Sequence, residues 1–359
     1  MEENKNNHII DIYKVIQVGN GPFDKIGIHR VTKDLYECSQ ATVVMVPGSN
    51  SDFNTSFFKM AVFLANQGVD VWGIDFRYSF VPDDINSNPY CLAKDCSFFK
   101  DQDTNLHISD LDILVKIAEM TAKGGKVFLL GFSQGAYFAY RYASQYPDIK
   151  GIIPMDIAYN IDPTLTDVIG SAMSDVIERQ AKIANGIYYE DVLTEKFIAS
   201  EALQNPDGPS VVIPGLTNKQ AFLFALTATY QLPGFNVPGF RYNHGTIADL
   251  VYTDYNTMIT QTGKLNSFQS ILPITELERQ YIEPTPSIPN ITVPILHVAA
   301  EVGFGTFGFY TPDRISEFNN DVTKCLISDY GHADLVYSNT ADVDVWNKIC
   351  KWIKQHSQH

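Results

Sequence analysis

Residues 127–140 read Val-Phe-Leu-Leu-Gly-Phe-Ser-Gln-Gly-Ala-Tyr-Phe-Ala-Tyr, which places Ser133 between two glycines. The apolar run 127–130 is typical of a buried strand, and residues 134–146 carry a helical pattern that a proline ends. A strand that turns directly into a helix forces strained backbone angles on the serine, so the flanking glycines must stay small. The alternative is a glycine-serine turn between two ordinary elements. The strand and helix context favours a nucleophile elbow, which projects the Ser133 hydroxyl at the carboxyl end of the strand.

Apolar runs alternate with helical patterns through most of the chain, which predicts a mainly parallel sheet with crossover helices. The predicted strands are residues 12–18, 26–31, 42–46, 69–74, 127–130, 149–155, 291–298 and 322–328, the first two as an antiparallel pair. Helices between and after them are predicted at residues 57–67, 106–123, 134–146, 313–319 and 343–355. The fold class is therefore α/β, with the sheet flanked by helices.

The alternation stops between two core strands, where helical patterns occur at residues 165–185, 192–204, 219–231 and 246–260. A block this large is better explained as an inserted, mostly helical cap than as a structureless loop. We therefore expect three segments: a first core part (residues 1–157), the cap (residues 158–290) and a second core part (residues 291–359).

Composition and charge limit the kinds of partner and the cell compartments that we expect for this chain. The chain has 359 residues, 45% of them hydrophobic, and a formal charge of −15 with no Lys/Arg cluster, so nucleic acid is not an expected partner. No stretch reaches the roughly 20 apolar residues that span a bilayer. We expect a soluble protein, either cytoplasmic or secreted with its targeting segment removed. The sequence carries no marker of oligomeric state.

The five cysteines form no metal-ligand pattern, so the sequence predicts neither a metal nor a cofactor. Cys91 and Cys96 are the only close pair. Their spacing allows a local disulfide, and free thiols are the alternative.

A serine hydroxyl needs a base within hydrogen-bond reach and an acid that orients the base. Of eight histidines, only His332 lies in a loop between the last predicted core strand and the last helix, in Tyr-Gly-His-Ala-Asp at residues 330–334. His297 falls inside a predicted strand, where a packed core histidine is expected. His332 is therefore the predicted base.

The chain resembles the α/β-hydrolase superfamily over residues 12–156 and 291–355. The resemblance implies the chain order nucleophile, acid, histidine, with Ser133 and His332 at the matched positions. It also implies an oxyanion hole built from two backbone N–H groups, one from Gln134 and one from Ser49 in Pro-Gly-Ser-Asn at residues 47–50. Asn50 is the alternative second donor.

The acid has two candidates. Relatives usually carry it in the turn after the seventh strand, and that position here is Gly303, with Glu301 two residues earlier. Some branches place it after the sixth strand, where Asp156 stands. A carboxylate at the end of a buried strand is costly unless it is paired, and a histidine Nδ1 proton would satisfy it. Asp156 is therefore favoured and Glu301 is the alternative acid; a third reading has Asp156 only capping the first helix of the cap.

A serine nucleophile predicts a serine hydrolase that forms an acyl-enzyme and cleaves a carboxylic ester, or an amide, lactone or thioester, of a small molecule. An acyltransferase on the same fold and a non-catalytic member that binds a small molecule are the alternatives. The cap is rich in aromatic residues, which form either an apolar acyl or aryl pocket or, as is more common for such residues, the core of the cap itself. These residues are Tyr188, Tyr189, Phe222, Phe224, Tyr230, Phe235 and Phe240.

Overall fold

An eight-stranded sheet forms the centre of the computed structural model, which describes residues 9–33, 39–82, 96–122, 125–227, 231–232, 235–243, 249–284 and 290–358. The strand order is β1-β2-β4-β3-β5-β6-β11-β12. The strands are β1 (Ile10–Gln17), β2 (Lys25–Thr32), β3 (Ala41–Val46), β4 (Val69–Asp75), β5 (Phe128–Phe132), β6 (Gly151–Met155), β11 (Ile295–Ala300) and β12 (Val322–Ile327). Strand β2 runs antiparallel to both of its neighbours, and every pair from β4 to β12 is parallel. The predicted mainly parallel sheet is confirmed.

The apolar runs of the sequence form the middle of this sheet. Every residue of β3, β5, β6 and β11 is buried, because a parallel sheet is covered on both faces and its strands need no polar side. The edge strand β12 is half-exposed and carries Thr323 and Lys324 toward solvent, which discourages pairing with another chain.

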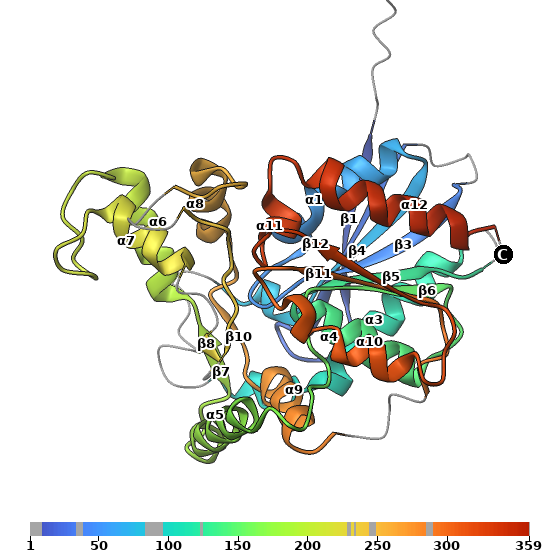
Figure 1. Ribbon diagram of the computed structural model, residues 1–359, viewed down its shortest axis with the longest axis horizontal. Helices are drawn as coiled ribbons and strands as arrows, with labels where there is room; N and C mark the ends of the chain where they lie inside the picture. The colour runs from blue at the N-terminus through green and yellow to red at the C-terminus, as the bar shows by residue number, and fades with distance from the viewer. Residues whose placement is uncertain are drawn as a thin grey trace, which may run out of the picture.

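Helices cover both faces (Figure 1). Helices α1 (Phe53–Asn66) and α12 (Asn347–His356) enclose one apolar core with the sheet, and α3 (Thr104–Glu119) and α4 (Gln134–Gln145) enclose the other. The second core lies on the face that also carries α10 (Tyr310–Ile315). The parallel strands therefore end at one edge of the sheet between two packed layers, and this edge carries the candidate site.

Helix α1 begins earlier than the sequence pattern predicts. The apolar periodicity starts at residue 57, whereas the helix starts at Phe53, because the Asp52 carboxylate accepts a hydrogen bond from Thr55 N and caps it. Helix α12 begins at Asn347, later than predicted, since residues 342–346 form a π-helical turn in front of it.

The cap contains more elements than were predicted. They are α5 (Thr166–Ala184), β7 (Tyr189–Asp191), α6 (Leu193–Gln204), α7 (Asn218–Thr227), β8 (Gln231–Leu232), β9 (Phe235–Asn236), α8 (Tyr255–Gly263), β10 (Phe268–Ser270) and α9 (Leu272–Ile282). Helices α5 and α6 lie where the patterns predicted them. Helix α7 ends before residue 231, and α8 starts at residue 255 rather than 246, after its capping residue Asp254. Helix α9 and the short strands were not predicted.

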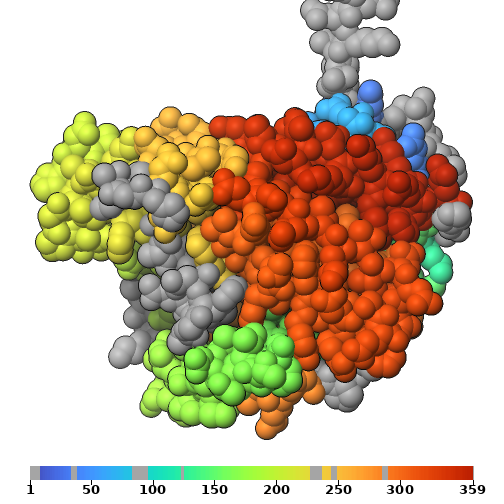
Figure 2. Space-filling view, in the orientation of Figure 1, coloured from blue at the N-terminus to red at the C-terminus, as the bar shows by residue number. Residues whose placement is uncertain are grey.

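The cap has two parts that pack differently. Helices α6, α7 and α8 share an apolar core containing Ile198, Phe222 and Met258, and they project from the main body (Figures 1 and 2). Helix α5 pairs with α9, and both contribute apolar side chains to the main core. The domain boundaries at residues 157 and 290 stay a prediction.

No helix within the described ranges has the length and apolar content needed to cross a bilayer. Cys96 is disulfide-bonded, whereas Cys325 and Cys350 are free thiols. Cys91, the partner that the sequence spacing allows for Cys96, lies outside the described residues.

Candidate active site

Ser133 occupies the turn between β5 and α4, with φ 55° and ψ −123°. A positive φ at a residue other than glycine costs on the order of 1–3 kcal/mol and persists only where packing enforces it. The enforcing contacts are close: a Cβ added to Gly135 would lie 2.0 Å from the carbonyl oxygen of Val46, and one added to Gly131 would lie 2.1 Å from that of Gly135. The glycines on both sides of Ser133 are therefore required, as the sequence predicted.

Asp156 lies directly after β6, is fully buried and has φ 49°. Its carboxylate accepts hydrogen bonds from Ala300 N (2.8 Å), from Phe304 N (3.1 Å) and from Nδ1 of His332 (2.7 Å). The structure thus joins Asp156 to His332. Asp156 does not cap the first cap helix, because α5 starts at Thr166.

The position where relatives usually carry the acid is filled by the Asp156 carboxylate. A Cβ added to Gly303 would lie 2.3 Å from Asp156 Oδ2 and 3.0 Å from His332 N. Glu301 instead is exposed, and its Oε2 accepts a hydrogen bond from Asp329 N (2.8 Å). The structure therefore does not bring Glu301 to the histidine.

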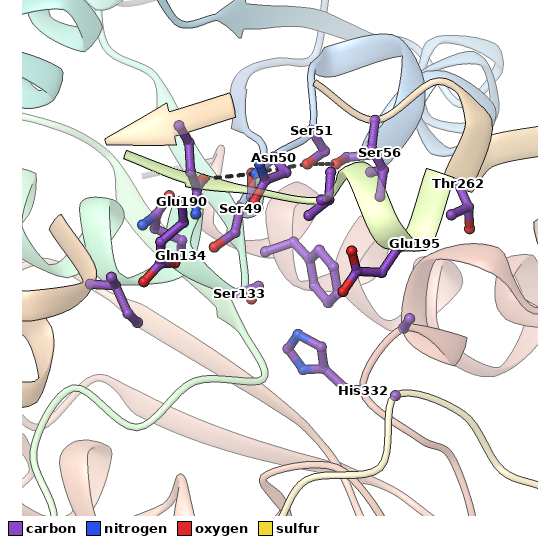
Figure 3. A pocket seen from close by; sticks show the side chains of 18 of the residues that line it. Ser49, Asn50, Ser51, Ser56, Ser133, Gln134, Glu190, Glu195, Thr262 and His332 are labelled. Carbon is purple, nitrogen blue, oxygen red and sulfur yellow. Dashed lines mark hydrogen bonds between the residues drawn. The ribbon is translucent and has the colours of Figure 1, made fainter. Parts of the chain in front are cut away.

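Aromatic rings hold the orientation of His332. Its imidazole stacks on Phe132, with ring centroids 4.7 Å apart and planes 28° apart, and Phe304 approaches it at 5.7 Å. His332 and Ser133 line the same cavity, and Figure 3 shows the imidazole facing Ser133.

The loop that carries His332 is hydrogen-bonded to a cap segment that we call the strap (residues 237–241). His332 N donates to the carbonyl oxygen of Pro238 (3.0 Å), and Ala333 N donates to that of Gly239 (2.6 Å). The cap is therefore part of the support of the candidate base.

Asp334 ties the same loop to the cap a second time. One carboxylate oxygen accepts from Gly331 N (2.9 Å) and from Arg241 N (2.7 Å), and the other accepts from Thr253 Oγ1 (2.6 Å). Burial raises the pKa of Asp334. Sequence reasoning missed this residue although it closes the quoted 330–334 motif; its place two residues after the histidine was the available signal.

The two candidate donors beside Gly48 differ. The N–H of Asn50 is engaged, because it donates to Gln269 Oε1 in the cap (2.8 Å). The N–H groups of Ser49 and Gln134 donate to no acceptor among the described residues. Gln134 is the first residue of α4, where helical N–H groups have no acceptor within the helix. Ser49 and Gln134 thus stay the predicted oxyanion donors.

A cavity of about 660 Å³ lies over Ser133, between the sheet edge and the cap. Much of its lining is apolar and includes Phe222, Leu226, Phe240, Met258, Leu277 and Phe304. Of the predicted cap aromatics whose side chains the structure describes, Phe222 and Phe240 alone line it. Phe224 is 47% exposed, Tyr188 and Tyr189 pack against the main core, Tyr230 is outside the described residues, and no side-chain placement is described for Phe235. Among the residues described, no cluster of His, Cys, Asp and Glu could hold a metal ion.

One side of the cavity is charged. Asp175, Arg179, Glu190 and Glu278, which we call the charged wall, all line it. Arg179 Nε bonds Glu190 Oε1 at 2.8 Å, and Arg179 also pairs with Glu278. Burial raises the pKa of Glu278 to about 7, an effect that Arg179 opposes and that Asp175 and Glu190 reinforce. Sequence analysis did not predict this group, because Glu278 lies 99 residues after Arg179 and only the folded chain brings the two together.

The sequence matches no protein-family model and no curated protein. Solved structures are similar over nearly the whole chain. A proposed lipase from Sulfolobus solfataricus has 21% identity and a TM-score of 0.68, covering 97% of this chain and 94% of its own. A thermostable carboxyl esterase from Bacillus coagulans has 15% identity, a TM-score of 0.58 and coverages of 97% and 99%. An epoxide hydrolase from an endophytic Streptomyces has 13% identity, a TM-score of 0.51 and coverages of 97% and 95%. At these identities the similarities show a shared fold.

Proposed function

The chain has the α/β-hydrolase fold, and we propose that it is a serine hydrolase that cleaves carboxylic esters, or closely related amides, lactones or thioesters. The observation that carries the proposal is the 2.7 Å hydrogen bond between His332 Nδ1 and Asp156, in a cavity that Ser133 also lines. A buried carboxylate that accepts a hydrogen bond from Nδ1 holds the proton on that nitrogen. Nε2 is then free to accept the proton of an attacking serine.

In the proposed acylation step, Ser133 Oγ attacks the carbonyl carbon of the ester while His332 Nε2 takes the hydroxyl proton. The charge that develops on the carbonyl oxygen is stabilised by the N–H groups of Ser49 and Gln134. Collapse of the tetrahedral intermediate breaks the bond to the alcohol oxygen, and protonated His332 gives its proton to the leaving alcohol. Asp156 stabilises the imidazolium throughout this step.

Deacylation repeats the sequence with water as the nucleophile. His332 takes a proton from the water, the resulting hydroxide attacks the acyl carbon, and Ser133 leaves with the proton returned by His332. The products are a carboxylic acid and the free enzyme. The apolar part of the lining includes Phe222, Phe240 and Met258. It suits an apolar acyl or aryl group, because binding removes the apolar surface of that group from water.

The test is hydrolysis of p-nitrophenyl esters of increasing chain length by the wild type and three variants. Ser133→Ala and Asp156→Asn are expected to lower kcat by factors of about 10⁴ or more and about 10³ to 10⁴, respectively. Glu301→Gln is the matched control, because it changes a neighbouring carboxylate that lies outside the cavity. Full loss of activity in Glu301→Gln with activity kept in Asp156→Asn would refute the proposed acid.

A further inference from the structure

We propose that the substrate carries a positively charged nitrogen on one limb, and that this limb lies against the charged wall while the other limb fills the apolar part of the cavity. The inference rests on the proposed hydrolase function, and it names a substrate class for that site: esters of amino alcohols or of amino acids.

The charged wall begins beside the candidate oxyanion loop. Glu190 and Gln269 are register partners in the antiparallel pair β7–β10, so their side chains leave the same face of the pair. Gln269 bonds the backbone N–H of Asn50, next to Ser49. Both Glu190 and Gln269 line the cavity. A substrate bound at Ser133 therefore has one limb within reach of the wall.

The wall has more negative than positive charge. Its carboxylates, on Asp175, Glu190 and Glu278, face a single guanidinium. Arg179 is committed to Glu190 and Glu278, so it does not offer an open site for an anion. Side-chain exposure falls from 31% at Glu190 to 16% at Arg179 and 5% at Glu278, and the excess charge thus reaches into the poorly solvated part of the cavity. A cation bound there gains more than it would in water.

A second, independent feature calls for a polar ligand. Gln134 lines the cavity and is only 4% exposed, and its Nε2 makes no hydrogen bond to the described residues. A buried amide without a partner costs about 1–3 kcal/mol, which a ligand atom that accepts its hydrogen bond would recover. Gln134 directly follows Ser133 in the chain, and Figure 3 draws both among the residues that line the cavity. A carbonyl or ester oxygen of the substrate can accept the hydrogen bond from Gln134 Nε2. The cationic limb of the same substrate then balances the excess negative charge of the charged wall.

An aromatic ring adds to the same side. Tyr281 follows Glu278 by one turn of α9 and lines the cavity. Its hydroxyl donates a hydrogen bond to the carbonyl oxygen of Ala158 (2.7 Å). The hydroxyl is thus directed into the protein, and the ring can contact a ligand. Aromatic faces attract alkylammonium groups. A carboxylate or phosphate on the same limb would meet three carboxylates and an arginine that is already paired with two of them, so it is disfavoured.

The test compares choline butyrate with its uncharged isostere, in which a tert-butyl group replaces the trimethylammonium group. A second pair carries the same two groups on the acyl limb of a p-nitrophenyl ester. We expect kcat/KM to favour the charged member of one pair by about tenfold or more, and Glu278→Gln to remove that preference. Glu190→Gln, at the more exposed end of the wall, is expected to reduce it. Glu276→Gln is the control: it makes the same charge change on α9, but this residue contacts Thr104 N and does not line the cavity.

Binding to Ser133→Ala separates this inference from the hydrolase proposal, since it needs no turnover. Calorimetry is expected to show that choline binds more tightly than the uncharged alcohol, and that adding Glu278→Gln, but not Glu276→Gln, abolishes the difference. Equal binding of the two alcohols together with equal kcat/KM in both ester pairs overturns the inference. If choline binds selectively and the wild type cleaves no ester, the cation site stands and the hydrolase proposal fails.

Discussion

Gly303 and Asp156 compete for one small volume. The carboxylate that reaches His332 comes from the end of β6, and the residue across from it has no side chain because a Cβ there would lie 2.3 Å from Asp156 Oδ2. The carboxylate of the proposed acid, Asp156, therefore leaves no room for a side chain at residue 303.

Gly303→Ala should therefore impair the proposed acid without touching Ser133. The added methyl group displaces the Asp156 carboxylate, so we expect kcat to fall at least about tenfold while KM changes less than about twofold. Gly170→Ala is the control, because a Cβ at residue 170 meets nothing within 4 Å; steady-state kinetics of the two folded variants decide. Unchanged kcat in Gly303→Ala would show that the close packing of Asp156 does not matter.

Glu278 makes the proposed cation preference depend on pH. Burial raises its pKa to about 7, so the carboxyl is neutral at low pH and charged at high pH. The kcat/KM ratio of choline butyrate to its uncharged isostere should rise between about pH 6 and 8. Both esters react at the same proposed catalytic residues, so any pH effect common to the two cancels in the ratio. A ratio that is flat across this range, or that falls as the pH rises, contradicts the role given to Glu278.

The turn at Ser133 and the candidate base could be predicted because each depends on local sequence: small residues around Ser133, and a loop histidine before the last helix. For the acid, the sequence favours Asp156 and leaves Glu301 open, because both follow core strands and only the packed sheet shows which one reaches the imidazole. The charged wall could not be predicted from the sequence either, because only the folded chain brings Glu278 to Arg179 and Glu190.

At the scale of elements, the strap couples the cap to the His332 loop. Three backbone N–H groups of residues 331–333 are fixed by strap carbonyls or by Asp334, which also holds Arg241 and Thr253 of the cap. A histidine loop held from the cap is expected to lose alignment when these bonds are cut.

Asp334→Asn tests this coupling. The amide cannot accept all three hydrogen bonds as strongly as the carboxylate, so we expect a fall of about tenfold in kcat with little change in KM, and a loss of about 1–3 kcal/mol in unfolding free energy. Asp342→Asn, an exposed carboxylate near the same loop, serves as the control. If Asp334→Asn lowers stability but leaves kcat unchanged, Asp334 stabilises the fold without aligning the His332 loop.

The elements that sequence analysis missed have weak local signals. Strands β7 and β10 are three residues each and are stabilised by pairing with each other, which periodicity cannot detect. Helix α9 follows strand β10 after a single residue and carries a proline in its first turn, a position where proline starts a helix rather than breaks it. The core strands, by contrast, were readable because burial on both faces leaves them uniformly apolar.

For the whole molecule, a buried histidine links stability to pH. His297 is fully buried in β11, with Nδ1 2.7 Å from the Tyr140 hydroxyl, and burial lowers its pKa to about 4. It is neutral in the folded protein, whereas in the unfolded chain it takes up a proton near pH 6.5. The unfolded state thus binds more protons between about pH 6.5 and 4, and stability is lost as the pH falls through this window.

Urea denaturation at several pH values measures this effect. The unfolding free energy should fall below pH 6.5 with a slope to which His297 contributes up to about 1.4 kcal/mol per pH unit. His107, whose pKa burial also lowers, adds to it. His297→Gln is expected to be less stable at pH 7 but to show a shallower slope. A slope identical to that of the wild type would mean that His297 is already protonated in the folded protein.

The central claim is that Ser133 is an activated nucleophile, and intact-mass spectrometry after brief exposure to a fluorophosphonate tests it most directly. The account predicts one rapid covalent adduct on the wild type and on Glu301→Gln, strongly slowed labelling of Asp156→Asn, and none of Ser133→Ala at the same exposure. Labelling of Ser133→Ala at the wild-type rate, or no adduct on the wild type, would contradict it.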